Sequence, residues 1–292
     1  MATWAATDIP DQTGRTVVIT GANSGIGAAA AGQLARAGAQ VIIACRNTEK
    51  GAAAAAAMSG PVEVRALDLA DLSSVRAFAE TVTEPVDILI NNAGVMATPL
   101  RRTPDGFELQ IGTNHLGHFA LTGLLLDRIR DRVVTVASSM HRAGRIRLDD
   151  LNWERRRYQR WGAYGQSKLA NLLFTYELGR RLTAAGSPVR AVAAHPGYAA
   201  TNLQAHTESV LDLLMRIGNR VFAQSAANGA LPTLYAAVTD VPTGSYAGPS
   251  GMSEMRGAPK LVQSSPAARD EDTAGKLWDL SEQLTGVTYK FG

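Results

Sequence analysis

The sequence lacks several features that would indicate other classes of protein. It contains one cysteine, Cys45, in 292 residues, so it can form neither an internal disulfide nor a zinc or iron–sulfur site built from cysteines. We therefore expect a reducing compartment and a cytoplasmic protein. No uncharged apolar run approaches the roughly 18–20 residues of a membrane helix, so we expect no integral membrane segment. Residues 1–14 have neither the positive start nor the apolar stretch of a signal peptide.

An excess of charge of one sign is also missing. The chain has 29 basic and 26 acidic side chains, a formal net charge of +3. Such a small surplus cannot sustain the phosphate-tracking surface of a nucleic-acid binder, so we expect no nucleic-acid partner. Hydrophobic residues make up 46% of the chain and charged residues 19%, which is enough apolar material for a core and argues against global disorder.

Short β-branched runs alternate along the chain with longer helical stretches. We expect strands at 16–20, 41–45, 62–67, 87–91, 132–137 and 189–194 and near 245–247, and helices at 25–37, 49–58, 73–82, around 107–126, at 164–185 and at 267–284. Because parallel strands need crossover connections, apolar strands that alternate with helices predict a parallel sheet covered on both faces. The expected fold is a single α/β domain over residues 1–292, a Rossmann-type doubly wound parallel sheet.

Two segments do not fit this alternation. Residues 141–161 carry seven arginines, three acids and two tryptophans, and residues 201–223 include an amphipathic stretch at 210–222. Both follow expected strands, and ligands of open α/β sheets bind beyond the carboxyl ends of the strands. We expect both segments to wall a substrate pocket, the first as a solvated loop. Most amphipathic helices pack on their own domain, but the position of 210–222 favours a mobile lid over an apolar substrate.

Three glycines, Gly21, Gly25 and Gly27, separate the first expected strand from the first expected helix. They would allow, in turn, a tight exit from the strand, close approach of the backbone to a pyrophosphate, and close packing of helix on strand. The helix N-terminus would offer N–H groups and a partial positive charge to the phosphates. A nucleoside triphosphate P-loop is excluded because no Gly-Lys-Ser/Thr follows. The pattern predicts a dinucleotide site formed by Gly21, Asn23, Ser24, Gly25, Ile26 and Gly27.

The second expected strand indicates which dinucleotide binds. NAD sites commonly carry a carboxylate about 20 residues beyond the glycines, which bonds the ribose 2′-OH. No acid occurs between Asp11 and Glu49, and Arg46 occupies this place. A guanidinium can pair with a 2′-phosphate through two charge-assisted hydrogen bonds. The cofactor is therefore predicted to be NADP(H), although Arg46 could also be a solvated residue at the end of a strand.

Tyr164 and Lys168 are four residues apart in an expected helix, so they share one face. A nearby ammonium lowers the pKa of a tyrosine from about 10 towards the range where it can act as an acid–base. Ser139 ends an expected strand, where its hydroxyl could bond a substrate oxygen. Asn114 places a polar group in the long central helix. Each feature alone has a structural explanation, but their order after the glycine turn favours catalysis.

Together these motifs resemble the short-chain dehydrogenase/reductase family over nearly the whole chain. The similarity extends to Asn91-Asn92-Ala93-Gly94 and to His195-Pro196-Gly197. Within the family, Ala44-Cys-Arg-Asn47, Ser167-Lys-Leu-Ala-Asn171 and the long interval from Ser139 to Tyr164 resemble the retinol dehydrogenase and WW-domain-oxidoreductase-like branch. That branch typically uses NADP(H) when the arginine is present.

The resemblance also implies a role for each site residue. Tyr164 would exchange a proton with the substrate, and Lys168 would lower the pKa of Tyr164 and hold the nicotinamide ribose. Ser139 would orient the substrate carbonyl, with Ser138 the weaker candidate, and Asn114 would position Lys168 through a water. Further cofactor contacts would come from Asp68, Leu69, Asn92, Ala93, Gly94, Pro196, Gly197 and Thr201. Members of the family commonly form homodimers or homotetramers.

The expected function is NADP(H)-dependent interconversion of a small-molecule carbonyl, a lipophilic aldehyde or ketone, and its alcohol. One alternative is a non-catalytic NADP(H)-binding redox sensor, which would be expected to lose the Tyr–Lys–Ser set. Another is a sugar-nucleotide epimerase or dehydratase, which would need a larger C-terminal domain than the hundred or so residues after 194 provide. His115 and His118 have no acid or cysteine close in sequence, so we expect packed or solvated side chains and no metal.

Overall fold

The computed structural model of the protein describes residues 3–197 and 225–291. The expected pocket wall 201–223 lies outside the described residues, and with it the amphipathic stretch 210–222 and the expected cofactor contact Thr201. Within the described part of the chain, no helix combines the length and the apolar character needed to cross a bilayer.

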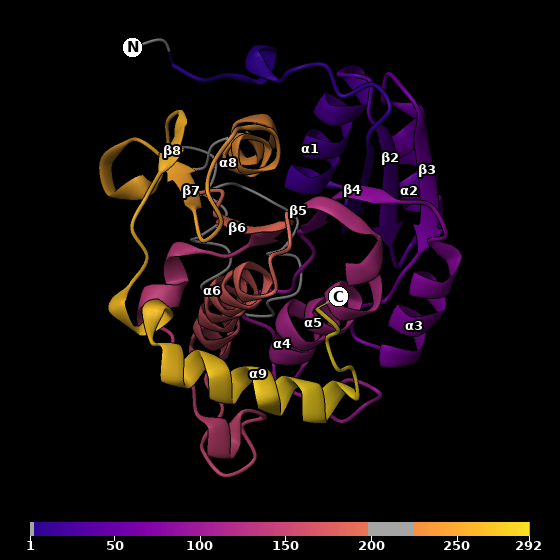
Figure 1. The fold of residues 1–292 in the computed structure, drawn as a ribbon. Coiled ribbons are helices and arrows are strands. Elements are labelled where there is room, and N and C mark those ends of the chain that lie inside the picture. Colours follow the sequence, from indigo (N-terminus) through magenta and orange to yellow (C-terminus); the bar gives the residue numbers. More distant parts are fainter. Residues whose placement is uncertain (1–2, 198–224, 292) are drawn as a thin grey trace.

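Eight strands form one sheet in the order β3-β2-β1-β4-β5-β6-β7-β8 (Figure 1). They are β1 (Thr16–Thr20), β2 (Gln40–Cys45), β3 (Val62–Ala66), β4 (Val86–Asn91), β5 (Ile129–Val136), β6 (Arg190–Ala194), β7 (Tyr246–Pro249) and β8 (Pro259–Leu261). All neighbours pair in parallel except β7 and β8, which are antiparallel. The direction of winding reverses between β1 and β4, where doubly wound sheets open a ligand crevice. The predicted Rossmann-type fold is confirmed, with one antiparallel edge strand added.

Helices cover both faces of the sheet because alternate side chains of each strand point to opposite faces. Val17 and Ile19 of β1 pack in the same cluster as α1 (Gly25–Arg36) and α8 (Ala226–Val238), whereas Val18 belongs to the cluster of the other face. That other face carries α3 (Leu72–Thr81), α5 (Gly117–Leu125) and α6 (Arg160–Ala184). The C-terminal helix α9 (Glu271–Thr285) lies across α6 and α5 (Figure 1). The remaining helix beside β2 and β3 is α2 (Thr48–Ala56).

The long central helix predicted around 107–126 is divided. It consists of α4 (Leu109–Ile111), a π-helical turn (Gly112–Leu116) and α5. A single π-turn inside a helix often marks a functional site, and Asn114 lies within this one. The helix predicted at 267–284 is also divided, into a 3₁₀ turn (Pro266–Arg269) and α9, because Asp270 adopts an extended conformation and caps α9.

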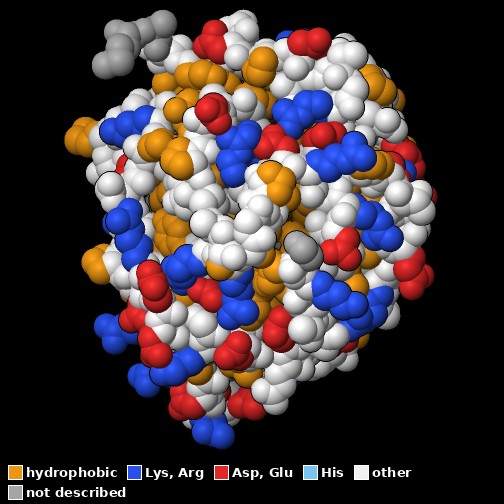
Figure 2. Space-filling model, viewed as in Figure 1, with side chains coloured by type: hydrophobic (Ala, Val, Ile, Leu, Met, Phe, Trp, Pro, Cys, Tyr) orange, Lys and Arg blue, Asp and Glu red, His pale blue; other side chains and the backbone are white. Residues whose placement is uncertain are grey.

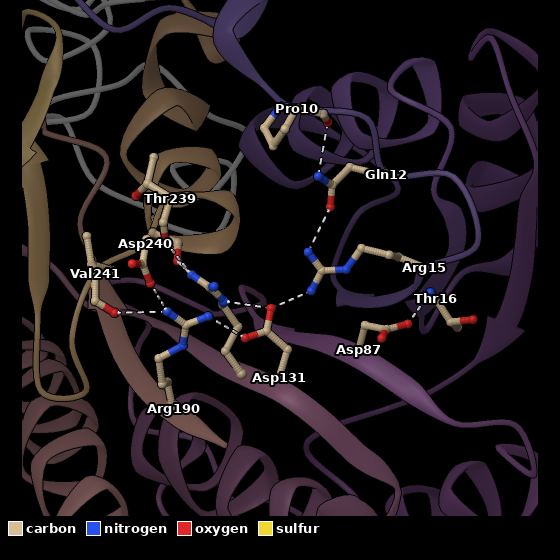
Figure 3. A network of polar contacts seen from close by, with 12 residues as sticks. Pro10, Gln12, Arg15, Thr16, Asp87, Asp131, Arg190, Thr239, Asp240 and Val241 are labelled. Atoms are coloured by element: carbon tan, nitrogen blue, oxygen red, sulfur yellow. Dashed lines mark hydrogen bonds and ion pairs between the residues drawn. The ribbon is translucent and has the colours of Figure 1, made fainter. Parts of the chain in front are cut away.

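Asp131 of β5 anchors the edge of the sheet at which the strands begin (Figure 3). Its carboxylate binds Arg15, which precedes β1, Arg190 of β6 at 2.7 Å and the adjacent Arg132 at 3.2 Å. Arg132 is 3% exposed, and its Nη1 donates to the carbonyl groups of Ala236 and Thr239 at the end of α8. One carboxylate therefore connects three strands with α8 at the edge opposite the expected cofactor crevice.

Candidate active site

The glycine turn between β1 and α1 has no room for side chains. Gly21 and Gly25 have φ angles of 68° and 58°, which side-chain-bearing residues rarely adopt. A Cβ atom on Gly21 would lie 2.8 Å from the Cβ of Ala93, and one on Gly27 would lie 2.5 Å from Nδ2 of Asn92. The turn is thus pressed against the chain that leaves β4.

The first N–H groups of α1 have no partner within the helix, as at any helix N-terminus. Ser24 occupies the N-cap position without a side-chain cap bond, and it is exposed, whereas Asn23 is half-buried and Ile26 packs in the core. Backbone donors therefore lie at the point where the sheet reverses its winding. This cradle fits a dinucleotide pyrophosphate.

Thr20 connects this turn to the end of β4. Its Oγ1 accepts the backbone N–H groups of Asn92 at 2.9 Å and Ala93 at 3.0 Å, and Asn92 Nδ2 donates to its carbonyl at 2.8 Å. His118 Nδ1 lies 3.0 Å from the Asn114 carbonyl and must donate to it, so Nε2 of the ring accepts from the Thr20 hydroxyl, 2.9 Å away. This hydroxyl also lies 3.4 Å from the Ile90 carbonyl. Burial lowers the pKa of His118 to about 4, so the ring is neutral and can take both roles. Sequence reasoning missed this role of Thr20 and expected His118 to be merely packed or solvated.

Arg46 follows β2 and is largely exposed, with 73% of its side-chain surface accessible. Its Nη1 lies 3.9 Å from Oδ2 of Asp68, which follows β3 and whose other oxygen accepts the N–H of Ala70 at 3.0 Å. Both residues therefore lie at the carboxyl ends of neighbouring strands, on the β2 side of the glycine turn. Leu69 differs, because its side chain is buried in the core and its carbonyl is packed against Gly117.

Tyr164 and Lys168 lie on α6 and are almost completely buried, with 7% and 4% of their surfaces exposed. The Nζ of Lys168 lies 5.8 Å from the centre of the Tyr164 ring and donates to the carbonyl of Val136 at 3.0 Å. Burial raises the pKa of Tyr164 to about 12 and lowers the pKa of Lys168 to about 8, because both charged forms lose hydration. The direction for Tyr164 is opposite to the lowering by Lys168 that we expected, because the loss of hydration outweighs it. The helix begins at Arg160 rather than at Tyr164, so the pair lies within its second and third turns.

Ser138, and not Ser139, contacts Tyr164. A hydrogen bond between the Ser138 side chain and the Tyr164 hydroxyl opposes the rise in the pKa of Tyr164. Ser138 continues the extended backbone of β5 with φ −158° and ψ 155°, whereas Ser139 begins a 3₁₀ turn (Ser139–Ala143) and is exposed. The strand ends one residue earlier than our preference for Ser139 required, and Ser138 is the serine that lies beside Tyr164. Which of the two serines acts in catalysis stays a prediction.

Asn114 is completely buried beside Lys168. Its Nδ2 donates to the Val95 carbonyl and to Ser167 Oγ, both at 2.9 Å, and its Oδ1 accepts the N–H of Val95 at 2.8 Å. A Cβ atom on Gly94 would lie 3.0 Å from Asn114 Oδ1 and 3.6 Å from Lys168 Nζ. Asn114 therefore fixes the segment Asn92-Ala93-Gly94-Val95 against the Lys168 ammonium through direct contacts. A water between Asn114 and Lys168 stays a prediction.

The arginine-rich segment 141–161 packs on the protein through specific pairs. Arg156 stacks 3.6 Å from the centre of the Trp153 ring, lies 3.3 Å from Asp150 and donates to Gln166 at 2.6 Å. Trp161 is in α6, not in a loop; it is 42% exposed, and its ring centre is 6.2 Å from that of Tyr164. On the face shown in Figure 2, basic and acidic side chains are interspersed.

A buried carboxylate, Glu108, holds the last part of the segment 141–161 in place, and sequence reasoning did not find it. Glu108 is 0% exposed and accepts the N–H groups of Gln110 and Ile111 as well as the hydroxyl of Tyr158 at 2.8 Å. Gln110 in turn holds the N–H of Ala97 at 2.8 Å. These hydrogen bonds connect the loop after β4 with the segment before α6. The sequence gives no sign of this contact, because Tyr158 lies 50 positions from Glu108.

The remaining expected site residues lie beyond β6. Pro196 and Gly197 are half-buried directly after His195, and Gly197 has a φ of 67°. His115 and His118 have separate partners, since His115 Nε2 contacts Ser281 Oγ at 2.9 Å while His118 contacts Thr20.

The chain belongs to the short-chain dehydrogenase family, whose pattern it matches over residues 15–211. Within it, the structure brings together a tight glycine turn, a buried Tyr–Lys pair on one helix and a serine beside the tyrosine.

Named relatives cover almost the whole chain. The chain is 44% identical to human retinol dehydrogenase 13 over 290 residues (94% of this chain, 85% of that protein) and 43% identical to human retinol dehydrogenase 12 over 293 residues (95% and 88%). A crystal structure of a putative uncharacterized protein from Mycobacterium paratuberculosis is 56% identical and superimposes with a TM-score of 0.87, covering 99% of this chain and all of the other. A putative NAD(P)-dependent gluconate 5-dehydrogenase from Beutenbergia cavernae with bound NADP is 28% identical, with a TM-score of 0.60 over 77% of this chain and 90% of the other.

Proposed function

We propose that the protein is an NADP(H)-dependent oxidoreductase that interconverts a lipophilic aldehyde or ketone and the corresponding alcohol. The observation that carries the proposal is the buried Tyr164 phenol, which contacts the Ser138 side chain and has the Lys168 ammonium one turn further along α6. The names of the curated relatives, which specify the lipophilic alcohol retinol, support a substrate of this kind.

The bound nicotinamide cofactor would supply or accept the hydride at the substrate carbon. In the direction of reduction, Tyr164 donates its proton to the carbonyl oxygen while Ser138 holds that oxygen with a hydrogen bond. A pKa of about 12 keeps the phenol protonated at neutral pH, which suits the donor role. Lys168 stabilises the phenolate that remains, because its positive charge is close and poorly hydrated. In oxidation the same groups act in reverse.

Tyr164→Phe tests the role of the phenol. We expect the variant to lose at least about 100-fold in the rate of carbonyl reduction, since general acid catalysis by one side chain contributes 10²–10⁴-fold. NADPH binding should be nearly intact, because the ring remains and only the hydroxyl is removed. The measurement is NADPH oxidation against aldehydes and ketones of increasing chain length, with fluorescence titration of NADPH as the control. A non-catalytic sensor would bind NADPH and show no turnover in either protein.

Arg46 is proposed to select NADP(H) over NAD(H). Its guanidinium is exposed at the end of β2, and Asp68, 3.9 Å away, pairs with it only loosely, so it can turn to a 2′-phosphate. Arg46→Asp should weaken NADPH binding by roughly 10-fold or more and strengthen NADH binding, because a carboxylate repels the phosphate and can accept the 2′-OH. Arg36→Asp, at the far end of α1, makes the same change in net charge and should leave the preference unaltered. An unchanged ratio of dissociation constants in Arg46→Asp would contradict this role.

A further inference from the structure

The hairpin loop between β7 and β8 contacts the end of β6 through Glu254. His195, the first residue after β6, has a completely buried ring whose Nδ1 accepts the N–H of Gly197 at 3.3 Å. The ring proton must therefore be on Nε2, which donates to Oε2 of Glu254 at 3.0 Å. Burial lowers the pKa of His195 to about 4, so the ring carries only this proton at neutral pH. The carboxylate thus fixes the orientation of the ring that holds the turn at Gly197.

The other oxygen of Glu254 reaches the loop that follows Ser138. Oε1 lies 3.6 Å from Nη2 of Arg142, and the same nitrogen donates to the carbonyl of Gln263 at 2.6 Å. Arg142 belongs to the 3₁₀ turn that starts immediately after Ser138. One carboxylate therefore connects the ends of two paired strands, β5 and β6.

His141 also holds the loop that follows Ser138, by connecting it with the segment after β8. His141 Nε2 accepts the N–H of Ser265 at 3.1 Å, so the ring proton is on Nδ1 and donates to the carbonyl of Ser138 at 2.7 Å. The segment after β8 thus supports the backbone of Ser138, which contacts Tyr164.

The backbone of the hairpin loop is held in an unfavourable conformation. Ser253 and Glu254 have φ angles of 54° and 56°, in the left-handed region that side-chain-bearing residues avoid. The hairpin and the turn after β6 also pack so closely that neither Gly197 nor Gly248 could carry a side chain. A Cβ atom on Gly197 would lie 2.5 Å from the Met255 carbonyl, and one on Gly248 would lie 2.2 Å from His195 Nε2. Such strain persists where the surroundings impose it, and it concentrates at functional sites.

We propose that Glu254 is a positioning residue, whose carboxylate fixes the His195-Pro196-Gly197 turn relative to the loop that carries Ser138. The inference rests on the proposed function, in which Ser138 holds the substrate oxygen, and on the cofactor contacts expected of Pro196 and Gly197, which would place this turn beside the nicotinamide. With the two loops held together, the hydride and the proton reach the same carbonyl group in the required geometry. Hydride transfer is sensitive to such positioning, since a displacement of about 1 Å can reduce a rate 100-fold.

Glu254→Ala tests the proposal, with Glu254→Gln and Met252→Ala as matched variants. The alanine variant removes both contacts, whereas the glutamine oxygen can still accept the His195 Nε2–H bond. Met252→Ala shortens a side chain of the same loop that is 86% exposed. We expect Glu254→Ala to lose roughly 10- to 100-fold in kcat, with the dissociation constant of NADPH changed less than about threefold because the phosphate cradle is distant. Glu254→Gln should recover most of the rate, and Met252→Ala should match the wild type.

Two spectroscopic measurements separate this proposal from the proposed function. The Nε2–H proton of His195 should give a slowly exchanging NMR signal in the wild type and in Glu254→Gln but not in Glu254→Ala. The fluorescence lifetime of bound NADPH should be shorter in Glu254→Ala alone, because the nicotinamide is less well held. If the wild type reduces no carbonyl but these differences appear, the proposed function fails and the positioning role stands. Equal kcat, lifetime and His195 signal in Glu254→Ala and the wild type would overturn the positioning role.

Discussion

At the scale of single residues, Lys168 combines a catalytic position with a destabilising environment. Its ammonium is buried, and the bond that it makes within the described residues, to the Val136 carbonyl, does not replace the hydration it has lost. The lowered pKa, about 8 against an ordinary 10.5, measures that loss. A charge kept in such a place stabilises a phenolate more strongly than a solvated charge would.

Lys168→Met should therefore be more stable than the wild type at pH 7, by on the order of 3 kcal/mol, although inactive. Below about pH 8 the lysine is protonated in the folded and unfolded chains, and the full penalty applies. Between about 8 and 10.5 the unfolded chain binds more protons, so the wild type gains stability with rising pH and the difference shrinks. The Val136 carbonyl is not left without a donor in the variant, because the Asn171 side-chain amide still donates to it at 3.2 Å. Urea unfolding of both proteins at pH 7, 9 and 10 measures this, and a difference independent of pH would contradict it.

The sequence predicted some site residues better than others. Tyr164, Lys168 and Asn114 lie close together, as their spacing and order in the sequence led us to expect. Whether Ser138 or Ser139 lies beside Tyr164 depends on the residue at which β5 stops being extended, and two adjacent serines carry no signal for that. Glu254 was missed because its partner His195 lies 59 positions away.

At the scale of elements, the central strands were predicted well, whereas α8 and β8 in the C-terminal third were not predicted. Strands β1, β2 and β4 each contain at least three consecutive buried apolar residues, and their patterns leave little choice of conformation. In contrast, α8 contains Asn228, Gly229 and Pro232, which are all poor helix formers, and it forms because its apolar face packs on α1 and the sheet. The three residues of β8 include Pro259, and β8 exists only through its pairing with β7.

At the scale of the whole molecule, binding chemistry and structural anchoring occupy opposite edges of the sheet. The glycine cradle, Tyr164 and Ser138 lie where the strands end, whereas the Asp131 carboxylate holds three arginines where they begin (Figure 3). Changes at one edge should therefore be separable from changes at the other.

Asp131→Ala should destabilise the fold by about 3 kcal/mol, because removing one partner leaves the buried Arg132 charge without its carboxylate. The rate per folded molecule should be unchanged. Asp240→Ala provides the control: this carboxylate also pairs with Arg190 at 2.7 Å but is fully exposed, so its loss should have little effect. Chemical denaturation measures both variants. Equal stability of Asp131→Ala and Asp240→Ala would show that the Asp131 contacts contribute no more than a surface ion pair.

The central claim is that the Ser138 side chain and the Tyr164 phenol together act on a carbonyl oxygen, and a matched pair of variants tests it most directly. The measurement is kcat/KM for NADPH-dependent reduction of a long-chain aldehyde by the wild type, Ser138→Ala and Ser139→Ala. We expect Ser138→Ala to lose roughly 100-fold, the effect of removing one donor to a developing oxyanion, and Ser139→Ala to lose little, since that residue is exposed. A loss in Ser139→Ala with an intact Ser138→Ala would contradict the account.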